Sequence, residues 1–291
     1  MNSGVHPSGT YTEEMNQIVF IGGGNMASAI ISGLVSRGRS AGSLHVVEPS
    51  DAQRDKLRVD FGVSSQARAD AALVGAQLVV WAVKPQTFSA AARDCGGVLR
   101  TALHLSVMAG IRIAAIARAT NAACVVRAMP NTPALIGQGI AGLYAPPEVS
   151  AAQRHQAQQI LEATGATLWV EHEADLDAVT AISGSGPAYV FYFVEAMMQA
   201  AQEMGLSAQV GRTLALATFS GSAALAQGSA ESPATLRERV TSKGGTTHAA
   251  LQSLEASGVK PAFVEALKAA HRRAQELGDQ FGEEPPPTDR S

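Results

Sequence analysis

The sequence predicts an α/β protein in which a doubly wound, mostly parallel sheet is followed by an all-α half. Short apolar runs typical of buried strands alternate with helical patterns as far as Val170. The first of these runs leads directly into a glycine-rich turn. Beyond about Asp175 the strand pattern disappears, and stripes with helical spacing replace it. Because 291 residues exceed one average domain, we expect a flexible leader, two domains and a disordered tail, with bounds 1–15, 16–175, 176–281 and 282–291.

The composition is that of a globular, soluble, intracellular protein. Hydrophobic residues make up 46% of the chain and charged residues 16%, which excludes disorder as the main state. A net charge of −3 gives no electrostatic case for nucleic acid or an anionic membrane surface, and no run reaches the ~18 apolar residues of a membrane span. Cys95 and Cys124 lie in apolar surroundings without metal-ligand spacing, so we expect reduced thiols and a cytoplasmic protein.

The first predicted strand, Ile18–Ile21, is followed by the pattern Gly22-x-Gly24-x-x-Ala27 and then by a helical pattern. Gly22 permits a tight turn, Gly24 lets the backbone approach a pyrophosphate, and Ala27 lets the helix lie on the strand. The helix N-terminus offers free N–H groups to the anion. The stretch therefore predicts a Rossmann-type site for a nicotinamide dinucleotide, formed in part by Gly22, Gly24, Asn25, Met26 and Ala27.

The second predicted strand, Ser43–Val47, ends at Glu48, and this end bears on cofactor choice. An acidic residue there accepts hydrogen bonds from the adenosine ribose and favours NAD. Ser50 and Arg54 would instead suit the 2′-phosphate of NADP. Glu48 lies 26 residues after Gly22 and precedes a proline, so a solvated loop residue is also compatible. The pattern leaves NADP and NAD open.

The strand Gln77–Val83 ends in Lys84-Pro85, where proline stops the ladder and starts a helix. Ligands of doubly wound sheets bind beyond the carboxyl ends of the strands. The expected cofactor site therefore also includes Ala82, Val83, Lys84 and Pro85, together with Ala109 after the strand 103–107; Lys84 lies near the ribose or is simply solvated. The remaining elements of this half are strands at 123–127, 139–145 and 166–170, a rigid turn at 129–133 and a helix at 149–164.

The all-α half consists of predicted helices at 187–204, 208–227, 233–240, 247–257 and 261–277. The first carries a methionine and aromatic stripe at helical spacing, which we interpret as core packing. The second is rich in small residues, which suits close helix packing within or between subunits.

Two stretches of this half are not explained by packing, namely Ile182–Tyr189 and Val240–Thr247. In the second, Gly244 and Gly245 free the backbone, and Thr246 and Thr247 are natural N-cap residues. Hydroxyls and N–H groups at the positive end of a helix suit a small carboxylate, so we favour substrate binding over simple capping.

Five motifs resemble those of pyrroline-5-carboxylate reductases and occur in the order found there. They are Gly-Gly-Gly-Asn-Met-Ala at 22–27, Ala-Val-Lys-Pro at 82–85, Met-Pro-Asn-Thr-Pro at 129–133, Ser-Gly-Ser-Gly-Pro-Ala-Tyr at 183–189 and Thr-Ser-Lys-Gly-Gly-Thr-Thr at 241–247. The resemblance spans residues 16–280, and its last two motifs are highly diagnostic. One departure is Lys243, where many members carry proline; it would assist the substrate carboxylate or be solvated.

This resemblance implies hydride transfer from NADPH or NADH to the C=N carbon of 1-pyrroline-5-carboxylate, which gives L-proline. It also implies a Rossmann-type domain followed by an all-α C-terminal dimerisation domain, and a homodimer that in many members assembles into a decamer. By the same resemblance, Ser242, Gly245, Thr246 and Thr247 would cradle the substrate carboxylate. The Thr247 hydroxyl would lie near the ring nitrogen, which makes Thr247 the candidate catalytic residue.

The residues are compatible with hydride transfer to an imine. A protonated imine is itself the electrophile, so the enzyme mainly has to align it with the cofactor. The hypothesis requires both helix starts to face one cleft, within a chain or across subunits. No metal is needed, and we interpret the polar run Glu171–Asp177 as a solvated linker and helix start. His248, next to the glycine-rich turn, is tempting as a proton donor but is more typical of a surface or packing residue.

Two other functions remain as alternatives. The first is a different imine- or 2-hydroxyacid-reducing enzyme of the same two-domain architecture, such as one that resembles 3-hydroxyisobutyrate dehydrogenases. These use a catalytic lysine, and Lys243, Lys260 and Lys268 of the helical half do not lie in such a context. The second is a cofactor-sensing binding protein, which would need the first motif only.

Overall fold

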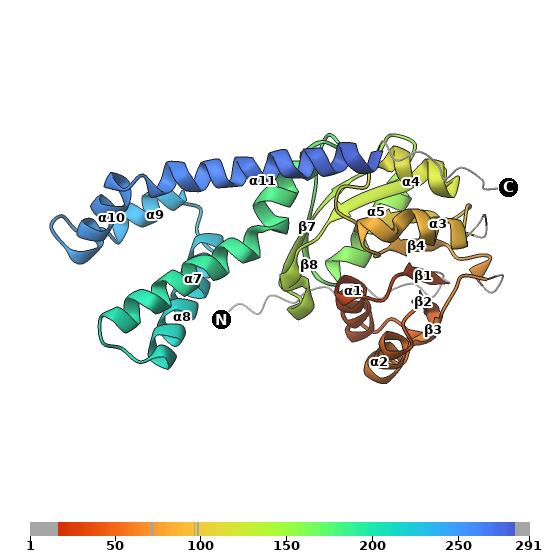
Figure 1. Ribbon diagram of the computed structural model, residues 1–291, viewed down its shortest axis with the longest axis horizontal. Coiled ribbons are helices and arrows are strands. Elements are labelled where there is room, and N and C mark those ends of the chain that lie inside the picture. The colour runs from red at the N-terminus through yellow and green to blue at the C-terminus, as the bar shows by residue number, and fades with distance from the viewer. Residues whose placement is uncertain (1–16, 71–72, 96, 98, 283–291) are drawn as a thin grey trace. The chain divides into compact units, whose positions relative to one another are not determined.

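A computed structural model of the chain describes residues 17–70, 73–95, 97 and 99–282 (Figure 1). The expected leader 1–15 lies outside the described residues, as does the expected tail apart from Gly282, which is the last residue of helix α11 (Val259–Gly282).

The described residues form two compact units. One comprises the residues up to Gly184 together with those from His271 onward, and the other runs from Ser185 to Ala270. Helices α6 (Asp175–Val179) and η5 (Thr180–Gly184) thus belong with the sheet, whereas the sequence placed a domain boundary after residue 175. The predicted boundary was placed where the strand patterns end. Strand patterns do not tell with which unit the helices that follow are packed.

In the described residues, eight strands form one sheet in the order β3-β2-β1-β4-β5-β6-β7-β8. The first strand, β1, pairs in parallel with both β2 and β4, and the β6–β7 pair is antiparallel. The prediction of a doubly wound, mostly parallel sheet is therefore confirmed. The strands are β1 (Ile18–Ile21), β2 (Leu44–Val47), β3 (Ser64–Gln66), β4 (Leu78–Trp81), β5 (Leu103–Ser106), β6 (Val125–Met129), β7 (Gly139–Tyr144) and β8 (Gly165–Trp169).

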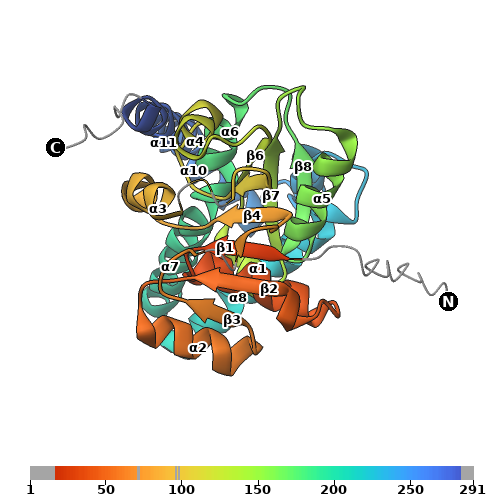
Figure 2. The same ribbon diagram turned by 90° about the vertical axis from the view of Figure 1, so that its right-hand side faces the viewer.

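Helices cover both faces of this sheet (Figures 1 and 2). Successive residues of a strand point to opposite faces, so Ile18 and Phe20 pack in one apolar cluster and Val19 and Ile21 in another. The first cluster includes α1 (Asn25–Ser36), α2 (Asp51–Phe61) and α5 (Ala151–Glu162), and the second includes α3 (Phe88–Cys95) and α4 (Ile113–Thr120). Besides α6 and η5, the described part of this unit contains the short helices η1 (Ala41–Ser43), η3 (Pro85–Thr87) and η4 (Thr132–Ile136).

The edge strand β3 was not predicted. It has only three residues, Ser-Ser-Gln, with no apolar run, and it is exposed or half-buried. It is a strand because it pairs in parallel with β2 at the edge of the sheet. Tertiary pairing, and not local pattern, decides its conformation.

The second unit is helical, as predicted. It contains α7 (Gly186–Glu203), α8 (Ala208–Gln227), α9 (Pro233–Arg239), α10 (Thr246–Ala256) and the first half of α11. A Cβ at Gly211 of α8 would lie 2.9 Å from the Cβ of Ala201 in α7, so the missing side chain lets these two helices approach closely. No helix in the described part of the chain is both long and apolar enough to cross a bilayer.

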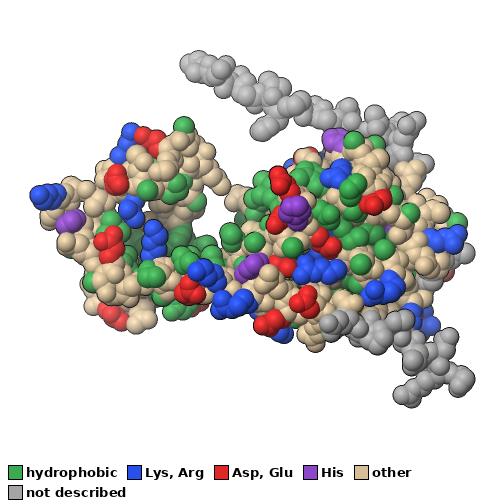
Figure 3. Space-filling view, turned by 90° about the horizontal axis from the view of Figure 1, so that it is seen from above, with side chains coloured by type: hydrophobic (Ala, Val, Ile, Leu, Met, Phe, Trp, Pro, Cys, Tyr) green, Lys and Arg blue, Asp and Glu red, His purple; other side chains and the backbone are tan. Residues whose placement is uncertain are grey.

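The stripe on α7 is only partly core, contrary to our interpretation. Val194 and Ala201 are buried, but Val190, Phe191 and Met197 are 43%, 59% and 39% exposed within one chain. Figure 3 shows hydrophobic side chains at the surface of this unit, among charged side chains of both signs. A helical stripe reports that a face is apolar, but it does not tell whether the same chain covers it.

Candidate active site

A cleft of about 410 Å³ opens at the carboxyl ends of β1, β2 and β4. This is the edge at which doubly wound sheets bind ligands. Its lining includes five of the predicted cofactor residues, namely Gly22, Gly24, Ala82, Val83 and Lys84. The first glycine motif and the Lys84-Pro85 strand end are therefore brought together, as expected.

The three glycines of the turn differ in what a side chain at each position would meet. Gly22 has φ +96°, and a Cβ there would lie 2.8 Å from the carbonyl oxygen of Ala82. A Cβ at Gly23 would lie 2.6 Å from Leu57 of α2. At Gly24, by contrast, φ is −68° and a Cβ would meet nothing within 4 Å. The chain itself thus leaves the space beside Gly24 open to a ligand.

The N-terminus of the helix that follows can bind an anion. Gly24 is the N-cap of α1 and no side chain caps this helix. The N–H groups of Asn25, Met26 and Ala27 have no acceptor within the helix, because the first N–H groups of any α-helix precede the carbonyls with which they would pair. Ala27 is fully buried in the cluster beneath α1, which is the close packing that its size predicted. The open space at Gly24 and the uncapped helix start fit a dinucleotide diphosphate.

Glu48 is not a solvated loop residue, which the sequence left as one interpretation. Its Oε2 accepts a hydrogen bond from the backbone N–H of Gly23 and its Oε1 accepts one from the N–H of Ser50, each at 2.9 Å. The side-chain amide of Gln53 donates to the carbonyl oxygen of Gly23 at 2.5 Å. The middle residue of the glycine turn is thus held on both sides from the segment after β2.

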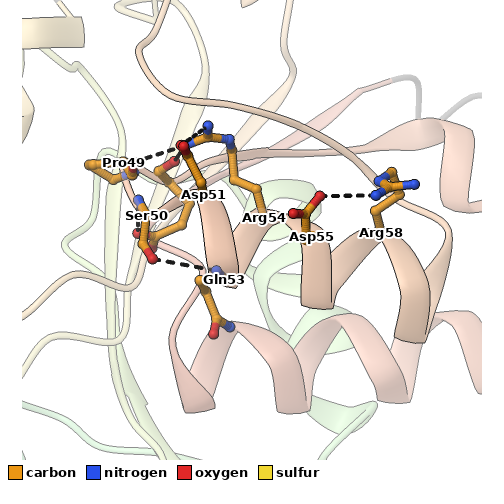
Figure 4. Close-up of polar contacts among 8 residues, drawn as sticks. Pro49, Ser50, Asp51, Gln53, Arg54, Asp55 and Arg58 are labelled. Carbon is orange, nitrogen blue, oxygen red and sulfur yellow. Dashed lines mark hydrogen bonds and ion pairs between the residues drawn. The ribbon is translucent and has the colours of Figure 1, made fainter.

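Ser50 and Arg54, the two residues expected to suit a 2′-phosphate, have partners within the chain (Figure 4). The Ser50 hydroxyl caps α2 by accepting from the N–H of Gln53. Arg54 Nη1 donates to the carbonyl oxygens of Glu48 and Pro49, at 2.7 and 2.9 Å. Its Nη2 pairs with the carboxylate of Asp51.

Two other predicted cofactor residues, Pro85 and Ala109, are not among the residues that line the cleft. Pro85 is the first residue of η3, directly after Lys84, and Ala109 follows β5. Sequence reasoning missed other lining residues: Ala67, Arg68 and Ala69 after β3, and Thr87, Ala90, Ala91, Asp94 and Cys95 on η3 and α3. The rest of the lining comes from the ends of β1 and β2, namely Ile21, Val47, Glu48 and Pro49. The proline at the start of η3 could have indicated the lining residues on η3 and α3. Those after β3 could not be found, because the strand β3 was not predicted. Burial raises the pKa of the Cys95 thiol to about 11, with Asp94 contributing.

The second glycine-rich turn lies in the helical unit. Gly244 has φ +77°, and the N–H of Gly245 donates to the carbonyl oxygen of Ser242 at 3.0 Å. Gly245, and not a threonine, is the N-cap, so Thr246 and Thr247 are the first two residues of α10 and no side chain caps it. A Cβ at Gly245 would lie 2.6 Å from the Ser242 Oγ, so this glycine makes room for the hydroxyl. His248 follows Thr247 and is half-buried.

The polar run Glu171–Asp177 is more than the solvated linker we predicted. Arg112 donates to both carboxylate oxygens of Asp177, at 3.1 and 2.7 Å, and the Asp177 side chain is 4% exposed. Glu173 accepts from Arg127 at 2.7 Å and from the N–H of Ile113 at 2.8 Å. Burial lowers the pKa of Arg127 and the charge of Glu173 opposes this shift. The run therefore ties α6 to β6 and to the start of α4.

A glycine turn held against a parallel sheet, followed by a helical unit with a second glycine-rich turn, defines a two-part, dinucleotide-dependent oxidoreductase. The chain belongs to the pyrroline-5-carboxylate reductase family. Residues 173–277 match the family model for pyrroline-5-carboxylate reductase dimerisation, and residues 17–110 match that for NADP oxidoreductase coenzyme F420-dependent.

Among similar proteins, pyrroline-5-carboxylate reductase from Pseudomonas aeruginosa is 44% identical over 92% of this chain and 98% of its own length. The enzyme of the same name from Pasteurella multocida is 38% identical over 92% of this chain and 100% of its own.

Solved structures agree. One of a pyrroline-5-carboxylate reductase from Coxiella burnetii has a TM-score of 0.85 at 35% identity, and one of Plasmodium falciparum pyrroline carboxylate reductase with NADP bound has 0.81 at 27%. Each covers 91% of this chain and 99% of the other.

Proposed function

We propose that this chain reduces 1-pyrroline-5-carboxylate to L-proline, the last step of proline biosynthesis, with NADPH as hydride donor and NADH as a second donor. The open space beside Gly24 at an uncapped helix start carries the cofactor part of this proposal. The names of the relatives support the substrate, and a relative with NADP bound supports the cofactor.

The diphosphate lies against the turn formed by Gly22 and Gly24 and receives the N–H groups of Asn25, Met26 and Ala27. The rest of the cofactor extends along Ala82, Val83, Lys84 and Pro85, with Ala109 and Ser50 at its borders. When bound, the reduced nicotinamide supplies the hydride. The cleft at these residues supports this assignment, because it is lined by both the glycine turn and the end of β4.

The turn at 242–247 holds the substrate. Ser242, Gly245 and Thr246 bind its carboxylate, and the Thr247 hydroxyl lies at the ring nitrogen and orients the protonated imine. The N-cap residue of α10 is Gly245, and no side chain caps this helix. The N–H groups at the positive end of the helix are therefore free to bind an anion, which supports this role. The protein contributes alignment, since the protonated imine is already an electrophile.

The protein acts as a homodimer, and the dimers associate into a decamer. The exposed apolar side chains of α7 support an interface on the helical unit, in agreement with the dimerisation model that this unit matches. A cytoplasmic location is consistent with Cys95 and Cys124, which are both free thiols.

A turnover assay with the purified full chain tests the proposal. The absorbance of the reduced nicotinamide is followed in two arms. It falls if NADPH or NADH reduces pyrroline-5-carboxylate, and it rises if NADP or NAD oxidises a small hydroxyacid. We expect oxidation of the cofactor with the imine and formation of proline. Turnover of a hydroxyacid alone would indicate a dehydrogenase, and cofactor binding without turnover of either substrate would indicate a sensor.

A further inference from the structure

Residues 107–112, which we call the β5 loop, connect β5 to α4 at the carboxyl edge of the sheet. The backbone N–H of Val107 donates to the carbonyl oxygen of Trp81, the last residue of β4, at 3.0 Å. The residue after Trp81 is Ala82, which lines the cofactor cleft. The β5 loop therefore begins beside this cleft, and it contains the predicted cofactor residue Ala109.

The place of the β5 loop in the sheet assigns it to the nicotinamide half of the cofactor. The inference rests on the proposed function, in which the diphosphate lies at the glycine turn after β1. In the sheet, β2 lies on one side of β1, and β4 and β5 lie on the other. Because the adenosine ribose of such a cofactor lies at the end of β2, the nicotinamide extends over the ends of β4 and β5. The β5 loop is then part of the surface that supports the hydride donor.

The end of α11 packs on the β5 loop. Figures 1 and 2 both show this end of the helix beside α4. Gly110, in the middle of the loop, has φ +76°, and a Cβ there would lie 3.2 Å from the ring of Phe281 and 3.3 Å from the Cβ of Leu277. The helix and the loop thus touch without space for a side chain between them. The position of the loop depends on the position of α11.

Arg112, the last residue of the β5 loop, is held from two other helices. Its guanidinium donates to both carboxylate oxygens of Asp177 in α6, at 3.1 and 2.7 Å. A Cβ at Gly278 of α11 would lie 2.6 Å from the Cζ of Arg112, so the guanidinium lies against backbone where only a glycine leaves room. A bidentate pair with a carboxylate that is 4% exposed leaves the arginine little freedom. Arg112 therefore fixes the end of the loop, and Phe281 fixes its middle.

We infer that Arg112 is a positioning residue for hydride transfer, which acts through the β5 loop and, together with Phe281, sets the place of the nicotinamide. Hydride transfer requires the donor carbon close to the imine carbon, and a small misplacement caused far from the reacting atoms slows it strongly. Neither Arg112 nor Phe281 is among the described residues that line the cofactor cleft. Both side chains therefore act on the alignment of the cofactor and not on its affinity.

The test separates alignment from binding. Arg112→Lys keeps the charge but cannot form the bidentate pair, and Phe281→Ala removes the ring that rests on Gly110. With saturating NADPH and pyrroline-5-carboxylate, we expect each change to lower kcat at least about tenfold, while the Kd of NADPH, from fluorescence titration without substrate, changes less than about threefold. With NADPH deuterated at the transferred position, the isotope effect on kcat should be at least as large as in the unaltered chain, because hydride transfer itself is slowed.

Arg154→Lys is the matched control, since it is the same substitution elsewhere in the sheet unit. Arg154 donates to the carbonyl oxygens of Ala145 and Pro146, at 2.6 and 3.0 Å, and its replacement should leave kcat unchanged. If Arg112→Lys does not fold, Phe281→Ala decides alone.

An unchanged kcat in either variant, an equal loss in Arg154→Lys, or a lower kcat with a smaller isotope effect would overturn the inference. A loss of NADPH affinity as large as the loss of kcat would do the same. A failure of the unaltered chain to turn over the imine would refute the proposed function together with this inference. Normal turnover by the unaltered chain and by both variants would refute the inference alone.

Discussion

The indole N–H of Trp81 donates a hydrogen bond to Nδ1 of His104, 2.9 Å away, between the neighbouring strands β4 and β5. Both side chains are completely buried. Because Nδ1 accepts, the ring proton is on Nε2, which donates to the carbonyl oxygen of Leu99 at 3.0 Å. A second ring proton would meet the indole N–H, so the native fold requires a neutral imidazole.

Stability should therefore depend on pH through His104. Burial lowers its pKa from the ordinary value of 6.5, so the folded state binds fewer protons here than the unfolded chain. We expect the full contribution above pH 6.5 and a progressive loss as the pH falls toward the lowered pKa. Urea unfolding at a series of pH values measures it. His104→Gln, which accepts from Trp81 but does not titrate, should flatten the slope; an unaltered slope would exclude His104 as its source.

The glycines of the first turn should separate folding from cofactor binding. Gly22→Ala puts a Cβ against Ala82 in a left-handed conformation, so we expect a loss of about 2 kcal/mol in the free energy of unfolding. Gly24→Ala has room in the folded chain and should change stability by less than ~0.5 kcal/mol. It should nevertheless weaken binding of NADPH by at least about tenfold, because its methyl group occupies the space proposed for the diphosphate. Equal stability losses in the two variants would contradict this distinction.

Thr247→Ala should lower kcat/KM for pyrroline-5-carboxylate by roughly ten- to a hundredfold, since one hydrogen bond to the reacting imine is lost. The dissociation constant of NADPH should be unchanged. Thr247→Ser keeps the hydroxyl and should restore most of the rate, and Ser253→Ala, on an exposed part of the same helix, is the control. Steady-state kinetics decide the matter; a Thr247→Ala enzyme with normal kinetics would remove this residue from the mechanism.

Asp177→Asn should be strongly destabilising, because it leaves the Arg112 guanidinium without its carboxylate in a site where the aspartate is 4% exposed. We expect a loss of about 3 kcal/mol in chemical denaturation. Asp55→Asn breaks a pair of similar length with Arg58, but there both side chains are about 70% exposed, so its effect should stay below ~0.5 kcal/mol. Comparable effects of the two changes would argue against a structural role for the buried pair.

Phe191→Asp should weaken self-association. Phe191 is 59% exposed in one chain and lies on α7 within the region that matches the dimerisation model. A charge at this position would be costly to bury in an interface. Sedimentation velocity should show a larger fraction of monomer than for the unaltered chain. Val59→Asp, at an even more exposed apolar position on α2 of the sheet unit, should leave the sedimentation profile as it is.

Much of the fold could be predicted because its signals are local. The apolar runs at β1 and β4 and the helical spacing of α7 identify these elements directly. The strand β3 could not be found, because Ser64–Gln66 is a strand only through pairing with β2. The reversal of β7 against β6 is likewise a property of the assembled sheet.

The candidate site was predictable to a similar extent. Gly22, Gly24 and Lys84 come together because strand ends of a parallel sheet meet at one edge. The sequence could not show that Glu48 holds Gly23, since that contact joins residues 25 positions apart through side-chain geometry. It also could not show that Glu173 and Asp177 meet Arg127 and Arg112, which come from distant elements. Charged residues in a polar run look the same in sequence whether they are solvated or paired.

Helix α11 begins in one compact unit and ends in the other, because its residues from His271 onward belong with the sheet. Ala274 and Gly278 in this last part are buried, and Gly278 lies directly against the guanidinium of Arg112. During translation the sheet unit is consequently incomplete until the final helix has left the ribosome, although most of that unit is made first. A nonsense mutation shortly before residue 271 would thus damage the nucleotide-binding part of the protein and not merely shorten its helical part.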